Sequence, residues 1–225
     1  MGELMQALQA RHSVRSYSDA PIPKDIQERL EAEIEECNNR EHLSIRLVTD
    51  EPDAFGGFRA HYGAFRNVRN YIALVGPKGP SLEERLGYCG ERIAILAQSL
   101  GLNSCWVAMS FRKGRTARAL VGSNEKLVCV IALGYGTTQG TPHRSKPLEK
   151  LYRSEGSAPG WFLDGVAAAS LAPTAVNQQK FRFTLVDENH VRAESSTGPY
   201  SKVDLGIVMY HFELGAGKDA FQWER

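Results

Sequence analysis

Short apolar runs that alternate with amphipathic segments constrain the fold of this chain more than any other feature of its sequence. Tyr71–Val75 and Leu127–Leu133 are continuously apolar, and each is closed by a glycine. Such runs indicate buried strands. Between them, the apolar residues from Leu86 to Leu100 recur every three or four positions, which predicts a long helix that ends at Gly101. Helices interleaved with strands predict an α/β or α+β sandwich around one sheet.

The remaining segments extend this pattern. We expect a first helix around Leu4 and Leu8, helices over Lys24–Cys37, Arg115–Val121 and Val203–Leu214, and one that carries Trp161. We expect strands at Ser44–Thr49 and Phe183–Val186, an apolar run at Cys105–Phe111, and a weak hairpin around Asn189. Pro52–Arg69 is rich in Gly, Asp, Arg and aromatic residues, so we expect a loop with a turn of helix.

The charge balance and the cysteines limit the class of protein. The 225 residues include 27 Lys and Arg against 26 Asp and Glu, and this net charge of +1 does not favour nucleic acid as a partner. The four cysteines are widely spaced, which favours buried thiols in a reducing cytosol. The N-terminus lacks a secretion signal, and no apolar run reaches about 18 residues. We therefore expect a cytoplasmic protein without a membrane partner.

A weak internal repeat indicates how the chain is organised. A shift of 138 positions aligns Asn39 with Asn177, and a second shift of 116 positions aligns Gly90 with Gly206. This pattern is typical of two related units, one full and one abridged, within one globule. Chance remains an alternative, because coincidences of glycines in helices are common. The predicted units are residues 1–147 and 148–225.

The segment Ala172–Phe181 links a predicted helix to a predicted strand. Pro173 ends the helix, and Thr174 and Ala175 have little bulk, so a flat ligand could approach the backbone there. Asn177 offers both a hydrogen-bond donor and an acceptor. The combination suits a planar heterocycle with C=O and N–H groups along its edge. The alternative is an ordinary turn between a helix and a strand.

The segment Arg11–Arg15 combines two guanidinium groups with the hydroxyl of Ser13. Arginine binds phosphate through bidentate, charge-assisted hydrogen bonds, so this segment is a candidate phosphate site. Arg144 and Lys146 follow a predicted strand and could close on the same phosphate. The alternatives are a solvated basic turn for the first segment and loop charges in water for the second.

The segment Val107–Ser110 lacks bulky charge, so its backbone N–H groups could face the edge of a ligand, unless it is ordinary strand core. No acid–base or nucleophile motif supports His12 or any other side chain as catalytic. The histidines lack metal-ligand spacing, and no Gly-x-Gly-x-x-Gly follows a strand. We therefore expect no catalytic side chain, no metal site and no Rossmann nucleotide site.

Together these segments resemble the nitroreductase family of FMN-dependent oxidoreductases, and the resemblance covers nearly the whole chain. The family's Arg-x-Ser-x-Arg-x-Phe/Tyr motif is matched by Arg11–Tyr17, and its Pro-Ser-x-x-Asn-x-Gln-Pro-Trp turn by Pro173–Phe181. A helix that ends in Leu-Gly-Leu-Gly-Thr-Cys-Trp is matched by Leu100–Trp106, and Gly-Tyr-Pro with Arg-Lys-Pro-Leu by Gly134–Gly136 and Ser145–Leu148. The two main motifs usually lie close in sequence. Their separation here resembles the Thermotoga-type branch, in which two units are fused.

The resemblance implies an α+β, nitroreductase-like α/β sandwich, a pseudo-dimer in one chain, and FMN as the cofactor. It implies that Arg11, Ser13, Arg144 and Lys146 hold the FMN phosphate, with His12 in the same motif, and that Arg15 reaches the pyrimidine edge of the ring. It implies that Pro173, Thr174, Ala175 and Asn177 flank the isoalloxazine, and that the backbone of Ala108, Met109 and Ser110 donates toward N5 and O4. Lys180, Phe181 and Ala108-Met109 depart from the family's Pro, Trp and Gly-Gly.

The implied activity is the transfer of two electrons from NADH or NADPH, through the flavin, to a nitroaromatic compound, a quinone or a similar small molecule. The implied assembly is a monomer that acts as a pseudo-dimer and binds one FMN. Two alternatives remain open at this point. One is a flavin-binding protein without reductase activity, and the other is a flavoenzyme of the same fold that catalyses dehalogenation or flavin breakdown.

Overall fold

The computed structural model describes residues 2–56 and 63–224. The chain divides into two compact units. The N-terminal unit comprises Ala10–Leu82 and Arg92–Thr141, and the C-terminal unit comprises Met1–Gln9, Glu83–Glu91 and Pro142–Arg225. None of the described helices is long and apolar enough to cross a membrane.

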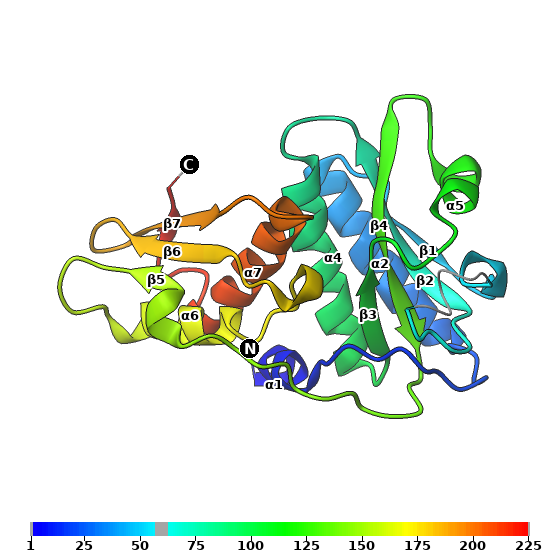
Figure 1. The fold of residues 1–225 in the computed structure, drawn as a ribbon, viewed down its shortest axis with the longest axis horizontal. Coiled ribbons are helices and arrows are strands. Elements are labelled where there is room, and N and C mark those ends of the chain that lie inside the picture. Colours follow the sequence, from blue (N-terminus) through cyan, green and yellow to red (C-terminus); the bar gives the residue numbers. More distant parts are fainter. Residues whose placement is uncertain (1, 57–62, 225) are drawn as a thin grey trace. The chain divides into compact units, whose positions relative to one another are not determined.

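The N-terminal unit is built on an antiparallel sheet of four strands in the order β1-β2-β4-β3 (Figure 1). Its strands are β1 (Arg46–Val48), β2 (Asn70–Pro77), β3 (Asn103–Val107) and β4 (Glu125–Gly134). The strands β2 and β4 are buried along most of their length, which confirms the two buried strands predicted from their apolar runs. Strands read as continuous apolar runs when both faces of a sheet are covered.

Helices α2 (Lys24–Glu41) and α5 (Lys113–Leu120) and the second half of α4 (Leu82–Ser99) belong to the same unit. Helix α2 buries Leu30, Ile34 and Cys37 at helical spacing, as the sequence predicts. It runs four residues beyond the predicted end at Cys37, and stops at His42, which adopts a left-handed conformation with φ 51°. A short 3₁₀ turn, η1 (Pro52–Ala54), begins the predicted loop Pro52–Arg69, and residues 57–62 of that loop lie outside the described part.

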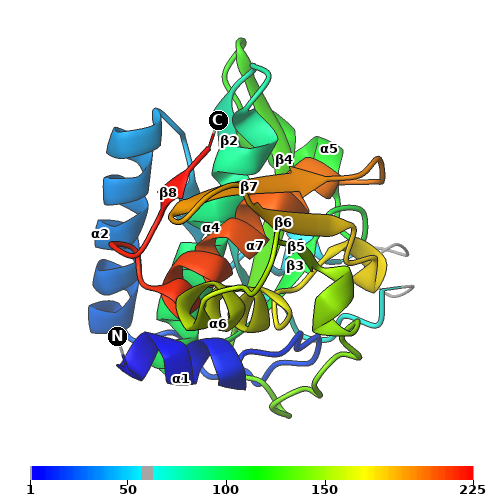
Figure 2. The same ribbon diagram turned by 90° about the vertical axis from the view of Figure 1, so that its left-hand side faces the viewer.

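The C-terminal unit contains a second sheet, in the order β5-β6-β7-β8. Its strands are β5 (Tyr152–Arg153), β6 (Phe181–Leu185), β7 (His190–Ser195) and β8 (Gln222–Trp223). The antiparallel β6–β7 pair is the predicted hairpin around Asn189 (Figure 2). Each outer strand pairs parallel with its neighbour. Aromatic rings fill the core of this unit, and the Phe183 and Phe212 ring centroids lie 4.5 Å apart.

Helices α1 (Gly2–Ala10), α6 (Gly160–Ala169) and α7 (Ser201–Ala216) and the first half of α4 complete the C-terminal unit, with 3₁₀ turns η2 (Leu148–Lys150) and η3 (Ala175–Asn177). Helix α7 is buried on most sides, as its apolar sequence predicts. Gly206 permits a close approach to α4, because a Cβ there would lie 2.6 Å from the backbone nitrogen of Tyr88. At the same crossing, Glu91 and His211 are fully buried and hydrogen-bonded at 2.8 Å.

The prediction of one sheet is wrong, because the described residues form two four-stranded sheets. The outer strands of the second sheet have only two residues each, too few to show a periodic pattern in sequence. The order helix, strand, strand, helix, strand occurs twice, as α2-β1-β2-α4-β3 and as α6-β6-β7-α7-β8. This order agrees with the repeat, which stays a prediction, as does its boundary between residues 147 and 148.

Candidate functional site

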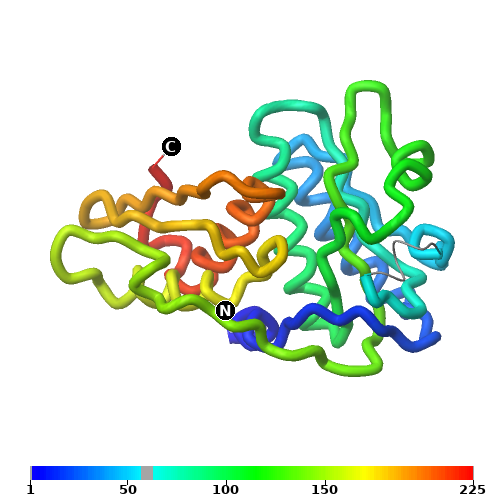
Figure 3. Tube along the Cα trace, viewed as in Figure 1, coloured from blue at the N-terminus to red at the C-terminus, as the bar shows by residue number. Residues whose placement is uncertain are grey.

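The Arg11–Tyr17 segment of the N-terminal unit is extended and lies beside β3 (Figure 3). The Val14 amide donates a 3.0 Å hydrogen bond to the Ser104 carbonyl oxygen, within a parallel bridge between Ser13 and Ser104. The buried Tyr17 hydroxyl donates to the Val14 carbonyl oxygen at 2.6 Å. The backbone of Val14 and the side chain of Tyr17 therefore anchor the segment.

The cations of this segment differ in exposure. Arg11 is 3% exposed, whereas Arg15 is exposed and Ser13 is half-buried. Burial raises the pKa of the neighbouring Cys105 thiol, while Arg15, a hydrogen bond with Ser13, and Arg11 act in the opposite direction. Both guanidinium groups are thus close enough to stabilise a negative charge at Cys105. An anion bound here would gain from the same field.

The predicted loop Ala108–Ser110 follows the same strand. Strand β3 ends at Val107, so these three residues lie outside the strand. Their backbone N–H groups are therefore not part of the strand core, which was the alternative interpretation of this segment. Met109 is 71% exposed. Ser110 packs against Gly63, where a Cβ would lie 2.7 Å from the Ser110 Cβ. Both groups of predicted site residues in this unit therefore adjoin β3, one beside the strand and one directly after it.

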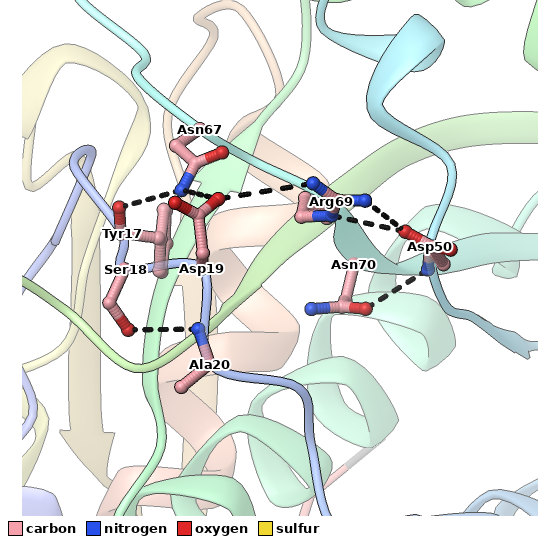
Figure 4. A network of polar contacts seen from close by, with 8 residues as sticks. All are labelled: Tyr17, Ser18, Asp19, Ala20, Asp50, Asn67, Arg69 and Asn70. Carbon is pink, nitrogen blue, oxygen red and sulfur yellow. Dashed lines mark hydrogen bonds and ion pairs between the residues drawn. The ribbon is translucent and has the colours of Figure 1, made fainter.

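A polar network fixes the chain just after the Arg motif (Figure 4). The Asn67 side chain donates from Nδ2 to the Tyr17 carbonyl oxygen at 3.2 Å and to Asp19 Oδ1 at 2.9 Å. Asn67 adopts a left-handed conformation with φ 55°, which asparagine tolerates better than most residues. Arg69 forms an ion pair with Asp50 at 2.6 Å. The network holds the backbone at Tyr17 and thereby limits movement of the motif.

In the C-terminal unit, the predicted ring-flanking turn has an unusual backbone. Val176, Asn177 and Gln179 all have positive φ, at 48°, 54° and 45°. A β-branched residue such as Val176 is a genuine outlier in this region. Its side chain is 91% exposed, so burial of the side chain does not offset the strain.

Polar contacts tie this turn to the predicted phosphate loop of the same unit. Asn177 Nδ2 donates to the Arg144 carbonyl oxygen at 3.0 Å, and Gln179 Nε2 donates to the same oxygen at 2.9 Å. Lys146 Nζ donates to the carbonyl oxygens of Gln178 and Gln179, at 3.0 and 2.7 Å. One N–H of the ammonium group and the exposed Arg144 guanidinium remain for a ligand.

Asp204, in the first turn of α7, holds the turn from the other side. Its Oδ1 accepts from the Ala175 amide at 2.9 Å and its Oδ2 accepts from Gln178 Nε2 at 2.7 Å. The side chain is nearly buried, and burial raises its pKa to about 6 against the opposing effect of these two hydrogen bonds. The Ala175 N–H is therefore engaged within the protein and does not serve a ligand.

Sequence reasoning missed Gln179 and Asp204. Gln179 occupies the Gln position of the Pro-Ser-x-x-Asn-x-Gln motif, so the motif itself carried the signal. For Asp204, the signal was the presence of an acidic residue in the otherwise apolar sequence of α7. The predicted residues fall into two sets. Arg11, His12, Ser13, Arg15, Ala108, Met109 and Ser110 belong to the N-terminal unit, and Arg144, Lys146, Pro173, Thr174, Ala175 and Asn177 belong to the C-terminal unit.

Comparison with known families decides the classification. The family model described as "Putative TM nitroreductase" matches residues 3–216. The chain belongs to this family. The match confirms the resemblance and includes the Arg11–Tyr17 and Pro173–Phe181 segments. No curated protein matches the chain.

Solved structures show the fold. A putative nitroreductase from Thermotoga maritima has a TM-score of 0.68 and 20% identity, and the match covers 96% of this chain and 84% of that one. A putative nitroreductase from Desulfovibrio desulfuricans in complex with FMN has a TM-score of 0.54 and 17% identity, with 69% and 96% covered. A putative NADH oxidase from Clostridium acetobutylicum has a TM-score of 0.52 and 19% identity, with 64% and 96% covered. The predicted α+β, nitroreductase-like fold is confirmed.

Proposed function

We propose that this chain is an FMN-dependent oxidoreductase. NADH or NADPH donates two electrons, and a nitroaromatic compound, a quinone or a similar small molecule accepts them. The observation that carries the proposal is the family match over residues 3–216, because it includes both segments to which the resemblance assigns flavin binding.

The residues present fit FMN. The Arg11–Arg15 segment offers guanidinium groups and the Ser13 hydroxyl on one extended strand-like stretch, and this donor set suits a phosphate. The Pro173–Ala175 stretch carries no bulky side chain, which suits contact with a flat ring. Asn177 already has two partners, and one N–H and one lone pair of its amide remain for the ring edge.

FMN, when bound, would supply the redox chemistry, a two-electron transfer from the nicotinamide to the acceptor. The chain's own residues then bind and orient. In the N-terminal unit, Arg11 and Ser13 would hold the phosphate, and Arg15 would supply positive charge at the pyrimidine edge of the ring. The backbone of Ala108–Ser110 donates hydrogen bonds to the ring. This division of labour accounts for a chain without an acid–base dyad in its sequence motifs.

The visible spectrum of the freshly purified protein tests the proposal. We expect a yellow protein with an FMN-to-chain ratio near one, because the fused arrangement implies one complete site per chain. A colourless protein that cannot be reconstituted with FMN would refute flavin binding. A ratio of two would refute the implied stoichiometry of one FMN per chain.

A pair of ligands and a pair of variants test the phosphate assignment. Arg11→Ala should weaken FMN binding by about 10- to 100-fold, the loss expected for a hydrogen bond to a charged group. Riboflavin, which lacks the phosphate, should lose little affinity. Arg118→Ala, which removes an exposed guanidinium of α5, is the matched control. An equal loss for both ligands in Arg11→Ala would contradict a phosphate contact.

The oxidation of NADH and NADPH in the presence of nitroaromatic and quinone acceptors tests the reductase activity. We expect turnover with at least one pair of donor and acceptor. A yellow protein that oxidises neither nicotinamide across a broad panel would favour a flavin-binding protein without reductase activity. The observation that favours this second function is the exposed Met109, which replaces a glycine of the family.

A further inference from the structure

The Thr174–Gln179 turn has left-handed backbone conformations that are not needed simply to connect a helix to a strand. Three non-glycine residues in left-handed conformations each cost on the order of 1–3 kcal/mol, and all three lie within four positions. Glycine would relieve this cost, yet the chain places valine, asparagine and glutamine there. Such a conformation persists only where its surroundings enforce it, and it points to a functional use.

Asp204 contacts the turn on both sides of its first two left-handed residues, Val176 and Asn177. Its Oδ1 fixes the Ala175 amide just before the left-handed Val176, and its Oδ2 fixes the Gln178 side chain just after the left-handed Asn177. Gln178 Nε2 also donates to the Pro199 carbonyl oxygen at 2.9 Å, which joins the turn to the segment that leads into α7. A single carboxylate thus bridges the two residues that flank the left-handed pair Val176 and Asn177.

The other contacts of the turn act at different positions. Lys146 binds the carbonyl oxygens of Gln178 and Gln179, and Gln179 binds the Arg144 carbonyl oxygen. These bonds hold the end of the turn to a loop. Asp204, by contrast, lies in the first turn of α7, where the backbone is regular and a carboxylate is favoured by the helix dipole. Its hydrogen bond to the Ala175 amide therefore anchors the start of the turn to a buried helix.

We propose that Asp204 is a positioning residue that holds the Thr174–Gln179 turn in the shape required for flavin binding. This inference rests on the proposed function. Asp204 acts through Ala175 and Gln178 and is assigned no contact with the flavin itself. Without the carboxylate, the left-handed residues relax toward ordinary conformations, and the surface offered to the ring is lost.

Three variants test this role. Asp204→Ala removes both acceptors, and Asp204→Asn keeps one oxygen that can accept from the Ala175 amide. Ser201→Ala, in the same helical turn, is the matched control. The first readout is hydrogen exchange of the Ala175 amide without FMN, which reports on the turn alone. The second is the dissociation constant of FMN, and far-UV circular dichroism checks that each variant is folded.

In Asp204→Ala we expect exchange at Ala175 to accelerate at least about tenfold and the dissociation constant of FMN to rise about tenfold, as for loss of a charge-assisted hydrogen bond. Asp204→Asn should recover most of the affinity, and Ser201→Ala should match the parent protein. If Asp204→Ala is folded and neither the exchange rate of the Ala175 amide nor the affinity for FMN changes, the proposal is overturned. It is also overturned if Asp204→Asn loses as much affinity for FMN as Asp204→Ala does.

The two readouts separate this inference from the proposed function. If the parent protein binds no FMN, the proposed function fails, and the exchange of Ala175 still decides whether Asp204 holds the turn. If the parent protein binds FMN and Asp204→Ala binds it equally well, the proposed function stands and the role of Asp204 is refuted.

Discussion

Replacing Gly206 with alanine is a direct test of how closely α7 approaches the first half of α4 within the C-terminal unit. A Cβ at position 206 would lie 2.6 Å from the Tyr88 backbone nitrogen and closer still to the Glu84 carbonyl oxygen. From the other helix, a Cβ at Gly87 would lie 3.0 Å from the Val203 carbonyl carbon. The two glycines therefore face one crossing, and both of the obstructing groups are backbone.

The size of the effect follows from this geometry. Ordinary contacts of a Cβ lie at 3.4–4 Å, so the helices must separate by roughly 1 Å, as no side-chain rotation can relieve a clash with backbone. Overpacking of this kind costs about 1–3 kcal/mol, and a backbone clash belongs at the upper end. Alanine recovers about 1 kcal/mol in helix propensity. The net destabilisation of Gly206→Ala should be about 2 kcal/mol.

Urea unfolding followed by far-UV circular dichroism measures this loss, and thermal unfolding should show a decrease in Tm of about 4–8 °C. Gly114→Ala in α5 is the control, because a Cβ there meets nothing within 4 Å. It should be neutral or stabilising by up to about 1 kcal/mol. If Gly206→Ala is as stable as Gly114→Ala, then α7 and α4 do not approach closely enough to exclude a Cβ at position 206.

Two further predictions concern buried ionisable groups of the same unit. Burial raises the pKa of Asp204 from 3.8 to about 6, so the folded state holds the proton more tightly than the unfolded state does. The protonated carboxyl group therefore contributes about 3 kcal/mol to the free energy of unfolding. This contribution is fully present below about pH 4 and is lost as the pH rises through 6. The difference in unfolding free energy between the parent protein and Asp204→Asn should change by this amount between pH 4 and 7.5, and a constant difference would contradict it. Glu91→Ala removes the carboxylate 2.8 Å from His211 Nε2 and should cost about 3–5 kcal/mol in urea unfolding, whereas Glu91→Leu combined with His211→Phe should cost less. A larger loss in the double variant would show that packing, and not the pair, dominates.

The sequence predicts those parts of the fold in which one segment determines its own structure. Strands β2 and β4 are apolar throughout because both of their faces are buried, and α2 shows its buried face as a spacing of apolar residues. The second sheet was missed because β5 and β8 depend on parallel pairing with distant strands, and two residues carry no period. The spacing of apolar residues within a segment reflects the burial of that segment, whereas pairing between strands distant in sequence does not affect this spacing.

The candidate site divides in the same way. The motif residues from Arg11 to Arg15 and from Pro173 to Asn177 can be located from sequence, because their types and spacing are themselves the signal. The left-handed conformation of Val176 was not predictable, since valine rarely adopts it. Asp204, which accepts a hydrogen bond from the amide of the preceding residue, Ala175, lies 28 positions further along the chain than Val176.

The two sets of candidate residues are held by different physical means, and this difference bears on which is more sensitive to change. The Arg11–Tyr17 segment follows β3 in an extended conformation that any residue can adopt, so single substitutions there should remove one contact each. The Thr174–Gln179 turn stores strain that several partly buried hydrogen bonds jointly offset. Removing one of these bonds releases the others as well. Variants of the turn's supports should therefore be non-additive, whereas variants of the Arg segment should be close to additive.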